Sequence, residues 1–487
     1  MDDKGRGMKL NQLTADMQGD IQGEGGDALV SGFAIDHRKV APGTIFGAFQ
    51  GARVNGEDYI ADAVRSGAVA VVARPGVTVE GAVHIASDEP RAAFARLAAA
   101  FFAPFPATAV AVTGTNGKTS TVEMTRQLWR MAGHHAASIG TLGVTTADER
   151  TYTGLTTPDV VTFLSNVAGL AREGVTHLAF EASSHGLTQY RTEGLKVSAA
   201  AFTNLSRDHL DYHGDMGAYL AAKMRLFSEV LSLDGTAVVW ADDVESGRVI
   251  DLARARGNKL VTVGTRGSTL KLVERHPTLL GQGLVIEDEH GQAHKVQLPL
   301  IGAYQAANAL VAAGLVLATG GDLTTTIANL SRLQPVRGRL ERAAIARSGA
   351  PVYVDYAHTP DAIEAAIAAL KPHAGGRLIV VIGAGGDRDP GKREVMGQVA
   401  SMHADRVIVT DDNPRTEDPA AIRAQVMRGA TGAIEIGDRR EAIAAAIAEA
   451  GEQDIVLIAG KGHEQGQIVG DLVLPFDDVT VARECAA

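Results

Sequence analysis

Residues 109–120 contain the feature that most constrains the fold of this chain. An apolar, β-prone run leads into a glycine-rich turn, Gly114-Thr115-Asn116-Gly117, and then into a helix-compatible segment that begins Lys118-Thr119-Ser120. A strand, turn and helix in this order let backbone N–H groups converge on phosphate oxygens, and the helix N-terminus adds partial positive charge. The lysine of such a loop reaches the β- and γ-phosphates, and its neighbouring hydroxyl holds Mg²⁺.

This phosphate-binding pattern is shortened. Val112 stands where the full pattern has a glycine, so that only G-x-x-G-K-T remains. An ordinary glycine turn is the alternative interpretation, but it explains neither the lysine nor the hydroxyl pair. We therefore expect a nucleotide-binding α/β domain around this loop.

Length and composition indicate a globular protein of several domains. The chain has 487 residues, 45% of them apolar and 21% charged, and at roughly 150 residues per domain this predicts three domains. The net charge of −11 argues against a nucleic-acid partner, which favours a basic face.

The cellular location is expected to be the cytoplasm. The single cysteine, Cys485, excludes an intrachain disulfide and fits a reducing compartment. Residues 1–7 are polar and lack the apolar core of a signal peptide. The most apolar window, 97–112, is interrupted by Pro104 and Pro106 and is too short to cross a bilayer, so no membrane insertion is expected.

The chain is expected to be an α/β protein of three domains. Residues 1–104 predict a small α/β domain, 105–337 the phosphate-loop domain, and 338–487 a doubly wound, Rossmann-like domain. In the first domain, Asp36 and Arg38 form either a binding turn or a surface ion pair, and their charges favour the ion pair. Residues 242–300 are expected to be mixed strand and loop.

Two further apolar runs of the central domain end in polar residues. Residues 177–180 lead to Glu181, and residues 199–202 lead toward His209. Ligands of open α/β sheets lie at the carboxyl ends of the strands, so these two side chains are expected near Lys118. Glu181 is a possible Mg²⁺ ligand, whereas a lone histidine is more often a core or surface residue because Mg²⁺ prefers oxygen.

The last domain has the clearest alternation of strands and helices. Four β-like runs at 351–354, 378–382, 406–410 and 455–459 are separated by helical patterns near 361–370, 393–403, 419–428 and 439–449. Every run ends in polar or charged residues. Four such loops at one sheet edge predict a binding face for an anionic or zwitterionic ligand.

Several short motifs together resemble the Mur ligase family. They are GTNGKT at 114–119, EASSH at 181–185, NLSRDH at 204–209 and DYAHTPD at 355–361. DNPR at 412–415 and GKGHE at 460–464 narrow the resemblance to the branch that adds diaminopimelate. Each motif alone is weak, but they follow the family order through all three predicted domains.

The resemblance implies a ligase of peptidoglycan precursor synthesis. Its small-molecule substrates would be ATP, UDP-MurNAc-L-Ala-D-Glu and meso-diaminopimelate, with Mg²⁺ as the metal cofactor. ATP would phosphorylate the γ-carboxylate of the D-glutamyl residue, and the diaminopimelate amine would attack the acyl phosphate. The resemblance also implies a monomer.

Residue roles are carried over motif by motif. The catalytic set would be Lys118, His209, Lys223 and Asp355, with Lys223 carbamylated to N6-carboxylysine so that it bridges metal ions. Thr119 and Glu181 would hold one Mg²⁺, and His209 the second. The residues implied to bind ATP are Gly114, Thr115, Asn116, Gly117, Lys118, Thr119, Ser120, Asn308, Arg339 and His358.

The resemblance also implies contact residues for the UDP-sugar peptide and for diaminopimelate. The UDP-sugar peptide would contact Ile35, His37, Thr156, Thr157, Ser183, Gln189 and Arg191. Diaminopimelate would contact Arg388, Asp412, Asn413, Pro414, Arg415, Gly460 and Glu464. The first domain departs from the family pattern, with His37 in place of a usual serine and 52–57 in place of a His-Gln-Ala-Asp-Gly run.

We expect Arg415 to determine which amino acid the enzyme accepts as its substrate. A guanidinium can form two parallel hydrogen bonds to a carboxylate, and diaminopimelate carries a carboxylate at the end where lysine has only an ammonium. The alternatives are a surface β-turn at 412–415, a lysine-adding ligase, a folylpolyglutamate-type ligase, and a nucleotide-gated binding or regulatory protein.

Overall fold

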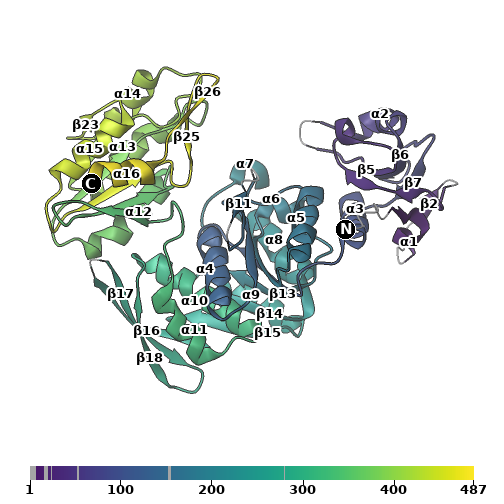
Figure 1. Cartoon of the computed structure of the whole chain (residues 1–487), viewed down its shortest axis with the longest axis horizontal. Coiled ribbons are helices and arrows are strands. Elements are labelled where there is room, and N and C mark those ends of the chain that lie inside the picture. Colours follow the sequence, from purple (N-terminus) through teal and green to yellow (C-terminus); the bar gives the residue numbers. More distant parts are fainter. Residues whose placement is uncertain are drawn as a thin grey trace. The chain divides into compact units, whose positions relative to one another are not determined.

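The computed structural model describes residues 7–15, 20–22, 25–51, 54–147, 149–151, 155–278 and 280–487 (Figure 1). Residues 1–6, which include most of the segment used to exclude a signal peptide, and residues 52 and 53 of the divergent loop lie outside the described residues. The chain divides into two compact units: Met1–Lys118, Gly133–Val239 and Asp243–Val261 form the first, and Thr119–Ala132, Trp240–Asp242 and Thr262–Ala487 form the second.

The first unit begins with a five-stranded sheet of order β2-β7-β6-β5-β4, in which only β2 runs antiparallel. Helix α2 covers one face with Ile60 and Ala63, and α3 covers the other with Phe94 and Leu97. The elements are β1 Met8–Lys9, α1 Leu10–Thr14, β2 Asp20–Gln22, β3 Leu29–Val30, β4 Gly32–Ala34, β5 Thr44–Gly47, α2 Ile60–Arg65, β6 Ala68–Ala73, β7 Val83–Ala86 and α3 Pro90–Phe102.

The rest of the first unit is built on parallel strands around β8. Strand β8 lies between β12 and β13, and both pair with it in parallel, so the three carboxyl ends share one edge. The elements are β8 Thr108–Thr113, β9 Ala136–Gly140, β10 Gly143–Thr145, β11 Arg150–Thr151, α5 Val160–Arg172, β12 His177–Glu181, α6 Ser184–Thr188, β13 Val197–Phe202, α7 Leu210–His213, α8 Met216–Arg225, β14 Leu231–Trp240 and α9 Ser246–Ala255.

One prediction for this region was wrong. Residues 242–300 were expected to be strand and loop, but helix α9 lies within them. Its apolar face is sparse, since Val249 and Ala253 are its buried hydrophobic residues, and such a face gives little periodic signal.

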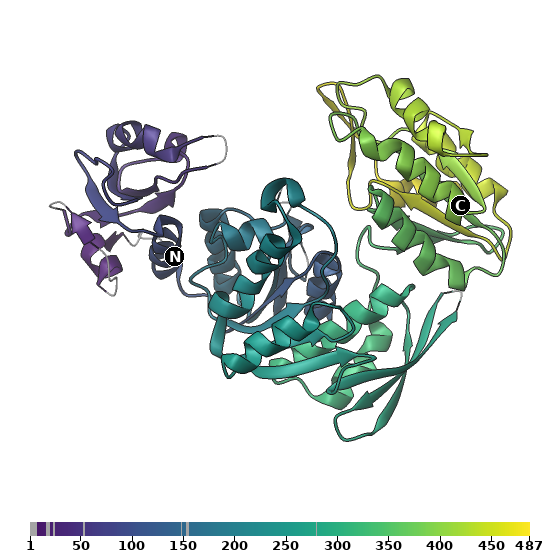
Figure 2. The same cartoon turned by 180° about the vertical axis from the view of Figure 1, so that it is seen from behind.

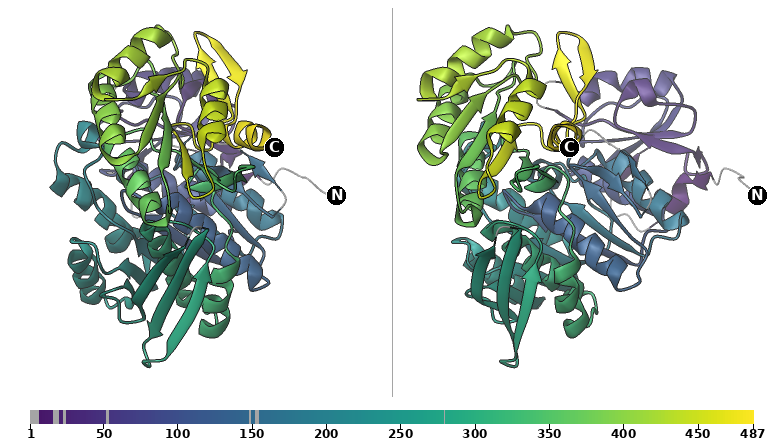
Figure 3. Two further views of the ribbon diagram at one scale, coloured as in Figure 1. Left: turned by 90° about the vertical axis from the view of Figure 1, so that its left-hand side faces the viewer. Right: turned by 60° about the vertical axis from the view of Figure 1, so that its left-hand side comes forward.

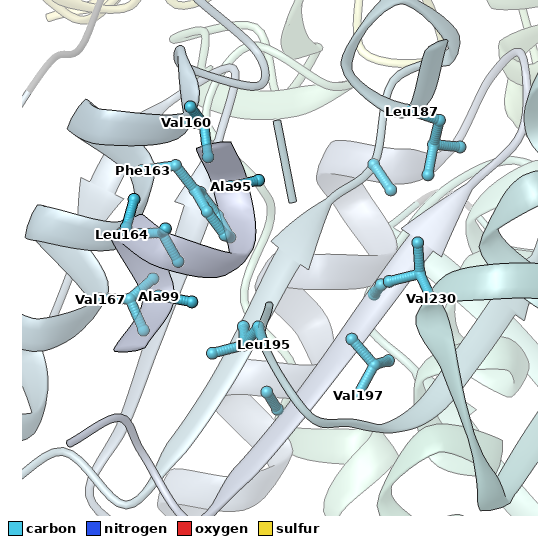
Figure 4. Packing of buried hydrophobic residues seen from close by; sticks show 14 of the residues in the cluster. Ala95, Ala99, Val160, Phe163, Leu164, Val167, Leu187, Leu195, Val197 and Val230 are labelled. Atoms are coloured by element: carbon cyan, nitrogen blue, oxygen red, sulfur yellow. The ribbon is translucent and has the colours of Figure 1, made fainter. Parts of the chain in front are cut away.

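Helices α3 and α5 of the first unit pack against each other, so that residues of the predicted first domain and of the predicted phosphate-loop domain share one hydrophobic cluster (Figure 4). Ala95 and Ala99 of α3 belong to this cluster, as do Phe163 and Val167 of α5. The backbone at Gly194 approaches α3 closely, because a Cβ at Gly194 would lie 2.3 Å from the Cβ of Ala99. Small residues therefore allow this close packing.

The second unit begins with the helix that follows the phosphate loop. The indole Nε1 of Trp129 on this helix, α4, donates to Thr319 Oγ1 at 3.2 Å. A ribbon of antiparallel strands, β16-β17-β18, follows in the sequence (Figure 2). The elements are α4 Lys118–Met131, β15 Lys259–Gly264, β16 Leu270–Thr278, β17 Gly281–Asp288, β18 Ala293–Leu298, α10 Ala303–Ala318 and α11 Leu323–Asn329.

The C-terminal sheet confirms the predicted doubly wound arrangement. Its order is β19-β20-β24-β21-β22-β23, and only β19 is antiparallel to its neighbour. The elements are β19 Glu341–Ile345, β20 Pro351–Asp355, α12 Pro360–Leu370, β21 Leu378–Ile382, α13 Gly391–His403, β22 Arg406–Val409, α14 Pro419–Gly429, β23 Ile434–Glu435, α15 Arg439–Glu449, β24 Ile455–Ala459, β25 Gly466–Val469, β26 Leu472–Pro475 and α16 Asp478–Ala486.

Helices cover both faces of this sheet (Figure 3). Helices α12, α13 and α14 pack on one face, and α15 and α16 pack on the other. The four predicted strands therefore deliver their terminal loops to one edge between two helical layers. None of the described helices has both the length and the hydrophobicity that a bilayer crossing requires.

A fully buried ion pair fixes helix α16 to the sheet. Arg439 donates to both carboxylate oxygens of Asp478, at 2.7 and 2.6 Å, and its Nη2 also donates to Ala459 O at 3.1 Å. Both side chains have no exposed surface. Removing one partner of such a pair leaves the other charge buried and uncompensated.

We expect Asp478→Ala to lower the free energy of unfolding by about 3–5 kcal/mol, because Arg439 would stay buried without its carboxylate. The neighbouring pair Arg440–Glu484 is half exposed and provides the control. Glu484→Ala should cost less than about 1 kcal/mol. Urea unfolding followed by circular dichroism measures both, and equal losses in the two variants would contradict the assignment.

Candidate active site

The turn after β8 has the backbone geometry of a phosphate cradle. Gly114 and Gly117 adopt φ angles of +147° and +85°, which favour glycine. A Cβ at Gly114 would lie 1.9 Å from Thr203 Oγ1, so another residue would clash there. Thr119 and Ser120 lie buried in the first turn of α4.

The loop after β13 braces this turn from the side. Asn116 N donates to Asn204 Oδ1 at 2.9 Å, and Thr203 Oγ1 donates to Asn116 O at 2.6 Å. Ser206 N donates to Thr115 Oγ1 at 2.9 Å. Two of these contacts, those of Asn204 and Ser206, come from the NLSRDH motif, so one role of that motif is to hold the glycine-rich turn in place.

Two lysines meet at one backbone oxygen of the turn. Lys118 Nζ donates to Gly114 O at 2.9 Å and to Thr115 O at 2.7 Å. Lys223 Nζ, from α8, donates to the same Gly114 O at 2.7 Å and lies 4.3 Å from the centre of the Tyr219 ring. The sequence-predicted residues Lys118 and Lys223 are thus neighbours.

Lys223 is only 1% exposed, and its surroundings disfavour a charge. Burial lowers its pKa well below the usual value, and the charge of Lys118 lowers it further, against a smaller opposing effect of Asp208. A neutral amine is the form that attacks CO₂. The environment therefore favours the chemistry that turns a lysine into a carbamate.

Glu181 provides a buried carboxylate at the end of β12. It is 2% exposed and accepts hydrogen bonds from Thr141 N at 2.7 Å and Thr141 Oγ1 at 3.3 Å. Carboxylate oxygen is the ligand type that Mg²⁺ prefers, so Glu181 fits the metal implied by the sequence. Lys223 fits it only as a carbamate, because an ammonium would repel the ion.

His209 differs from Glu181 in exposure and backbone. Its side chain is 46% exposed, and its φ of +52° places it in the left-handed region just before α7. Its ring lies 4.9 Å from that of His185. Among the described residues, no three His, Cys, Asp or Glu side chains form a group able to hold a metal by themselves.

The residues expected on the nucleotide side of the second unit form a connected chain. Asn308 Nδ2 donates to Gln305 Oε1 at 3.1 Å, and Gln305 Nε2 donates to Arg339 O at 2.9 Å. The buried carboxylate of Asp355 accepts from Leu340 N and Ala357 N at 2.7 and 2.9 Å.

Burial shifts the titration of two of these groups. It raises the pKa of Asp355, although the charge of Arg339 and the two backbone N–H groups act in the opposite direction. Burial also lowers the pKa of His358. The Nδ1 of His358 lies 2.9 Å from Tyr356 O, which orients its imidazole ring.

The DNPR turn is held by a buried lysine that was not among the predicted site residues. Lys461 is fully buried, and its Nζ lies 2.8 Å from Asn413 Oδ1, 3.4 Å from Glu464 Oε2 and 3.6 Å from Asp412 Oδ1. Asn413 Nδ2 also donates to Glu464 Oε2 at 2.8 Å. Lys461 therefore brings the DNPR and GKGHE motifs together.

Hairpin β25–β26 fixes the backbone of Arg415, which is left-handed at a φ of +51°. Arg415 N donates to Ile468 O at 3.0 Å, and Gly470 N donates to Arg415 O at 2.7 Å. The Arg415 Nη1 donates to Gly386 O at 2.8 Å, whereas Nε and Nη2 make no hydrogen bond to any residue in the described ranges. Arg388 is exposed on the neighbouring loop.

In the first domain, Asp36 and Arg38 form the expected ion pair. Arg38 donates to both oxygens of Asp36 and holds the pKa of that carboxyl at about 2. His37 lies between them in the chain. Its ring stacks on the ring of Tyr59, with the ring centres 4.3 Å apart and an angle of 5° between the ring planes. Ile35 is 38% exposed beside this turn.

The remaining predicted substrate residues lie around the end of β12. Thr157 Oγ1 donates to Glu181 O at 2.9 Å, and Thr156 Oγ1 lies 3.0 Å from Thr141 Oγ1. Ser183 caps α6 through Gly186 N. Arg191 Nη1 donates to Thr157 O at 2.7 Å, and its Nη2 donates to Gln189 Oε1 at 2.8 Å.

A braced glycine turn with two lysines, at the end of a parallel strand, places the chain in the class of nucleotide-binding α/β enzymes. Comparison with known proteins identifies the family within this class. The middle domain of Mur ligases matches residues 112–316, the glutamate ligase domain matches 338–462, and the Mur ligase catalytic domain matches 29–102. The chain therefore belongs to the Mur ligase family, and its relatives place it in the MurE group.

Those relatives share most of their length with this chain. A UDP-N-acetylmuramoyl-L-alanyl-D-glutamate–2,6-diaminopimelate ligase of Zymomonas mobilis is 61% identical over 94% of this chain and 95% of its own. The enzyme of the same name from Bradyrhizobium diazoefficiens is 51% identical over 92% and 93%. A solved structure of such a ligase has a TM-score of 0.75 at 33% identity and covers 99% of both chains.

Proposed function

We propose that this chain joins meso-2,6-diaminopimelate to the γ-carboxylate of D-glutamate in UDP-MurNAc-L-Ala-D-Glu, with hydrolysis of ATP to ADP and phosphate. The observation that carries the proposal is the set of relatives named for this activity, which match over nearly their full length and are 46–61% identical to the chain. The reaction belongs to peptidoglycan precursor synthesis. ATP and UDP-linked sugars are cytoplasmic metabolites, so we assign the enzyme to the cytoplasm, where it acts as a monomer.

Each predicted domain receives one task in this proposal. Residues 1–104 bind the uridine part of the nucleotide sugar, 105–337 bind ATP, and 338–487 bind diaminopimelate and contribute to nucleotide binding. The polar loops at the carboxyl edge of the C-terminal sheet support the last assignment, because open α/β sheets bind ligands at this edge.

The chemistry has two steps. The γ-carboxylate attacks the γ-phosphorus of ATP, ADP leaves, and an acyl phosphate forms. The diaminopimelate amine then attacks the acyl carbon, the tetrahedral intermediate expels phosphate, and the nitrogen loses a proton. Catalysis of such steps depends mainly on positioning and on neutralising charge.

For ATP, the proposed ligands are the backbone N–H groups of the turn 114–120 together with Lys118, Asn308, Arg339 and His358. Asp355 is placed in the catalytic set, where its buried carboxylate orders the backbone beside Arg339. Thr119, Glu181, His209 and carbamylated Lys223 would hold Mg²⁺, which supplies charge neutralisation at the phosphates.

The two other substrates have separate ligands. Ile35, His37, Thr156, Thr157, Ser183, Gln189 and Arg191 are proposed to contact the UDP-sugar peptide. Arg388, Asp412, Asn413, Pro414, Arg415, Gly460 and Glu464 are proposed to contact diaminopimelate. The unengaged Nε and Nη2 of Arg415 support a bidentate contact to the far carboxylate of that acceptor.

The test is phosphate release from ATP in the presence of UDP-MurNAc-L-Ala-D-Glu, with meso-diaminopimelate or L-lysine supplied in parallel. Turnover with diaminopimelate alone is the expected result. Turnover with lysine would keep the ligase reaction but overturn the acceptor. An absence of turnover with both would favour a nucleotide-binding protein without ligase activity.

A further inference from the structure

Two half-buried arginines of the first unit lie on adjacent segments, one from the predicted first domain and one from the phosphate-loop domain. Arg91 begins helix α3, and Arg191 follows helix α6. The segments that carry them lie side by side, because Tyr190 OH donates to Glu89 Oε2 at 3.0 Å. Arg191 has a role in the proposed function, whereas Arg91 has none.

The Arg91 guanidinium is held in one orientation. It lies 4.8 Å from the centre of the Phe49 ring, and its Nη2 donates to Gln50 O at 3.0 Å. Phe49 is itself packed edge-on against Phe94 of α3. These contacts leave Nε and Nη1 without a hydrogen bond to any residue that the structure describes, so two or more N–H groups remain for a ligand.

Arg191 is held in a similar way by Thr157 O and Gln189 Oε1. Gln189 Nε2 in turn donates to Tyr212 OH at 3.2 Å. Neither arginine makes an ion pair within the described ranges, and the acid that acts on Arg191 is Asp159, which caps α5.

The two charges are unfavourable without an anion. Burial lowers the pKa of each arginine, and the charge of Arg191 contributes to the lower pKa of Arg91. An arginine nevertheless remains protonated in water at neutral pH. Two partly desolvated cations, neither of them in an ion pair with a described residue, are an arrangement that binding of a doubly charged anion would stabilise.

We propose that Arg91 and Arg191 together bind the diphosphate of the UDP-linked substrate, with Arg91 as a binding residue of that site. The inference rests on the proposed function. Arg91 touches the loop after β5, in the domain assigned to uridine, and Arg191 belongs to the set assigned to the sugar peptide. The diphosphate is the group that connects these two parts of the substrate, and the N-terminus of the 13-residue α3 adds a favourable field.

The experiment compares binding of UDP and of uridine to the full chain by isothermal titration calorimetry. Arg91→Gln is the main variant, because it keeps a stem over Phe49 and removes the charge, and Arg91→Lys is the second. We expect Arg91→Gln to weaken UDP binding about 10- to 100-fold, with uridine binding changed less than about twofold. Arg96→Gln, an exposed arginine of the same helix, is the matched control and should change neither.

The outcomes separate the two proposals. If the parent binds UDP and the Arg91→Gln variant binds it equally well, the proposed role of Arg91 is overturned while the proposed function stands. Equal losses of UDP and uridine binding would show a structural effect and also overturn it. Weaker binding of UDP-MurNAc-L-Ala-D-Glu with normal UDP binding would assign the arginines to the glutamyl carboxylate instead. A parent that binds neither UDP nor the UDP-sugar peptide would overturn the proposed function.

Discussion

Replacement of Lys223 by methionine is expected to reduce ATP-dependent ligation by at least about a hundredfold while making the protein harder to unfold. The activity falls because methionine cannot become a carbamate and so cannot offer oxygen to a metal. The stability rises because a buried amine, disfavoured by burial and by Lys118, is replaced by an apolar side chain of similar length. Gly114 O keeps its hydrogen bond from Lys118, so no acceptor is abandoned.

The same residue predicts a pH dependence of stability. The pKa of Lys223 is lower in the folded chain than in the unfolded chain, where it is about 10.5. Between these two values the unfolded state binds more protons, so the free energy of unfolding of the unmodified parent should rise with pH. Lys223 therefore destabilises the folded chain most at pH values below its pKa in the folded state.

The measurement is urea unfolding of the parent and of Lys223→Met across pH 7–10, with and without bicarbonate. Bicarbonate should restore activity to the parent and reduce its pH dependence, because a carbamate no longer titrates as an amine. Lys196→Met, which alters an exposed ion pair with Asp234, is the control. Full activity of Lys223→Met, or a parent whose stability falls with pH across this window, would contradict the assignment.

Arg415→Ala is expected to lower kcat/KM for meso-diaminopimelate about a thousandfold and to remove the preference for diaminopimelate over L-lysine. A site built to hydrogen-bond a carboxylate rejects ligands that lack one, because its donors would otherwise be left unpaired. Once the guanidinium is gone, neither acceptor has that advantage. Phosphate release with each acceptor, at saturating ATP and nucleotide sugar, gives the ratio.

Backbone strain is separated from side-chain loss by a second variant. The φ of Arg415 is +51°, a conformation that asparagine tolerates better than alanine. Arg415→Asn should therefore match the selectivity loss of Arg415→Ala with less loss of stability. Arg428→Ala, on the exposed part of α14, controls for removal of one positive charge. A preserved preference for diaminopimelate in both Arg415 variants would overturn the role of this residue.

The parts of the fold that sequence could predict are those with a strong periodic signal. The C-terminal strands are continuous apolar runs followed by polar loops, and their parallel pairing brings four such loops to one edge. The phosphate loop was recognisable because glycine, lysine and hydroxyl residues follow a strand in a fixed order. Helix α9 was missed because few of its residues face the core.

Side-chain networks between distant segments left no comparable signal. In the sequence, Lys461 is one of several charged residues in a polar loop. Only the folded chain shows that it is buried against Asn413, 48 positions earlier. Arg439 is equally inconspicuous until Asp478 is seen beside it. The nearness of Lys223 to Lys118 was likewise implied by family resemblance, since a spacing of about a hundred residues carries no geometric information.

The pairing of Arg415 with strand β25 has a consequence for protein engineering. The backbone that orients this arginine is completed by residues more than fifty positions later, through Ile468 and Gly470. A graft of the four-residue turn 412–415 into another ligase would carry the guanidinium without the hydrogen bonds that set its direction. Exchange of acceptor preference between homologues would therefore require residues 466–475 to be moved as part of the same module.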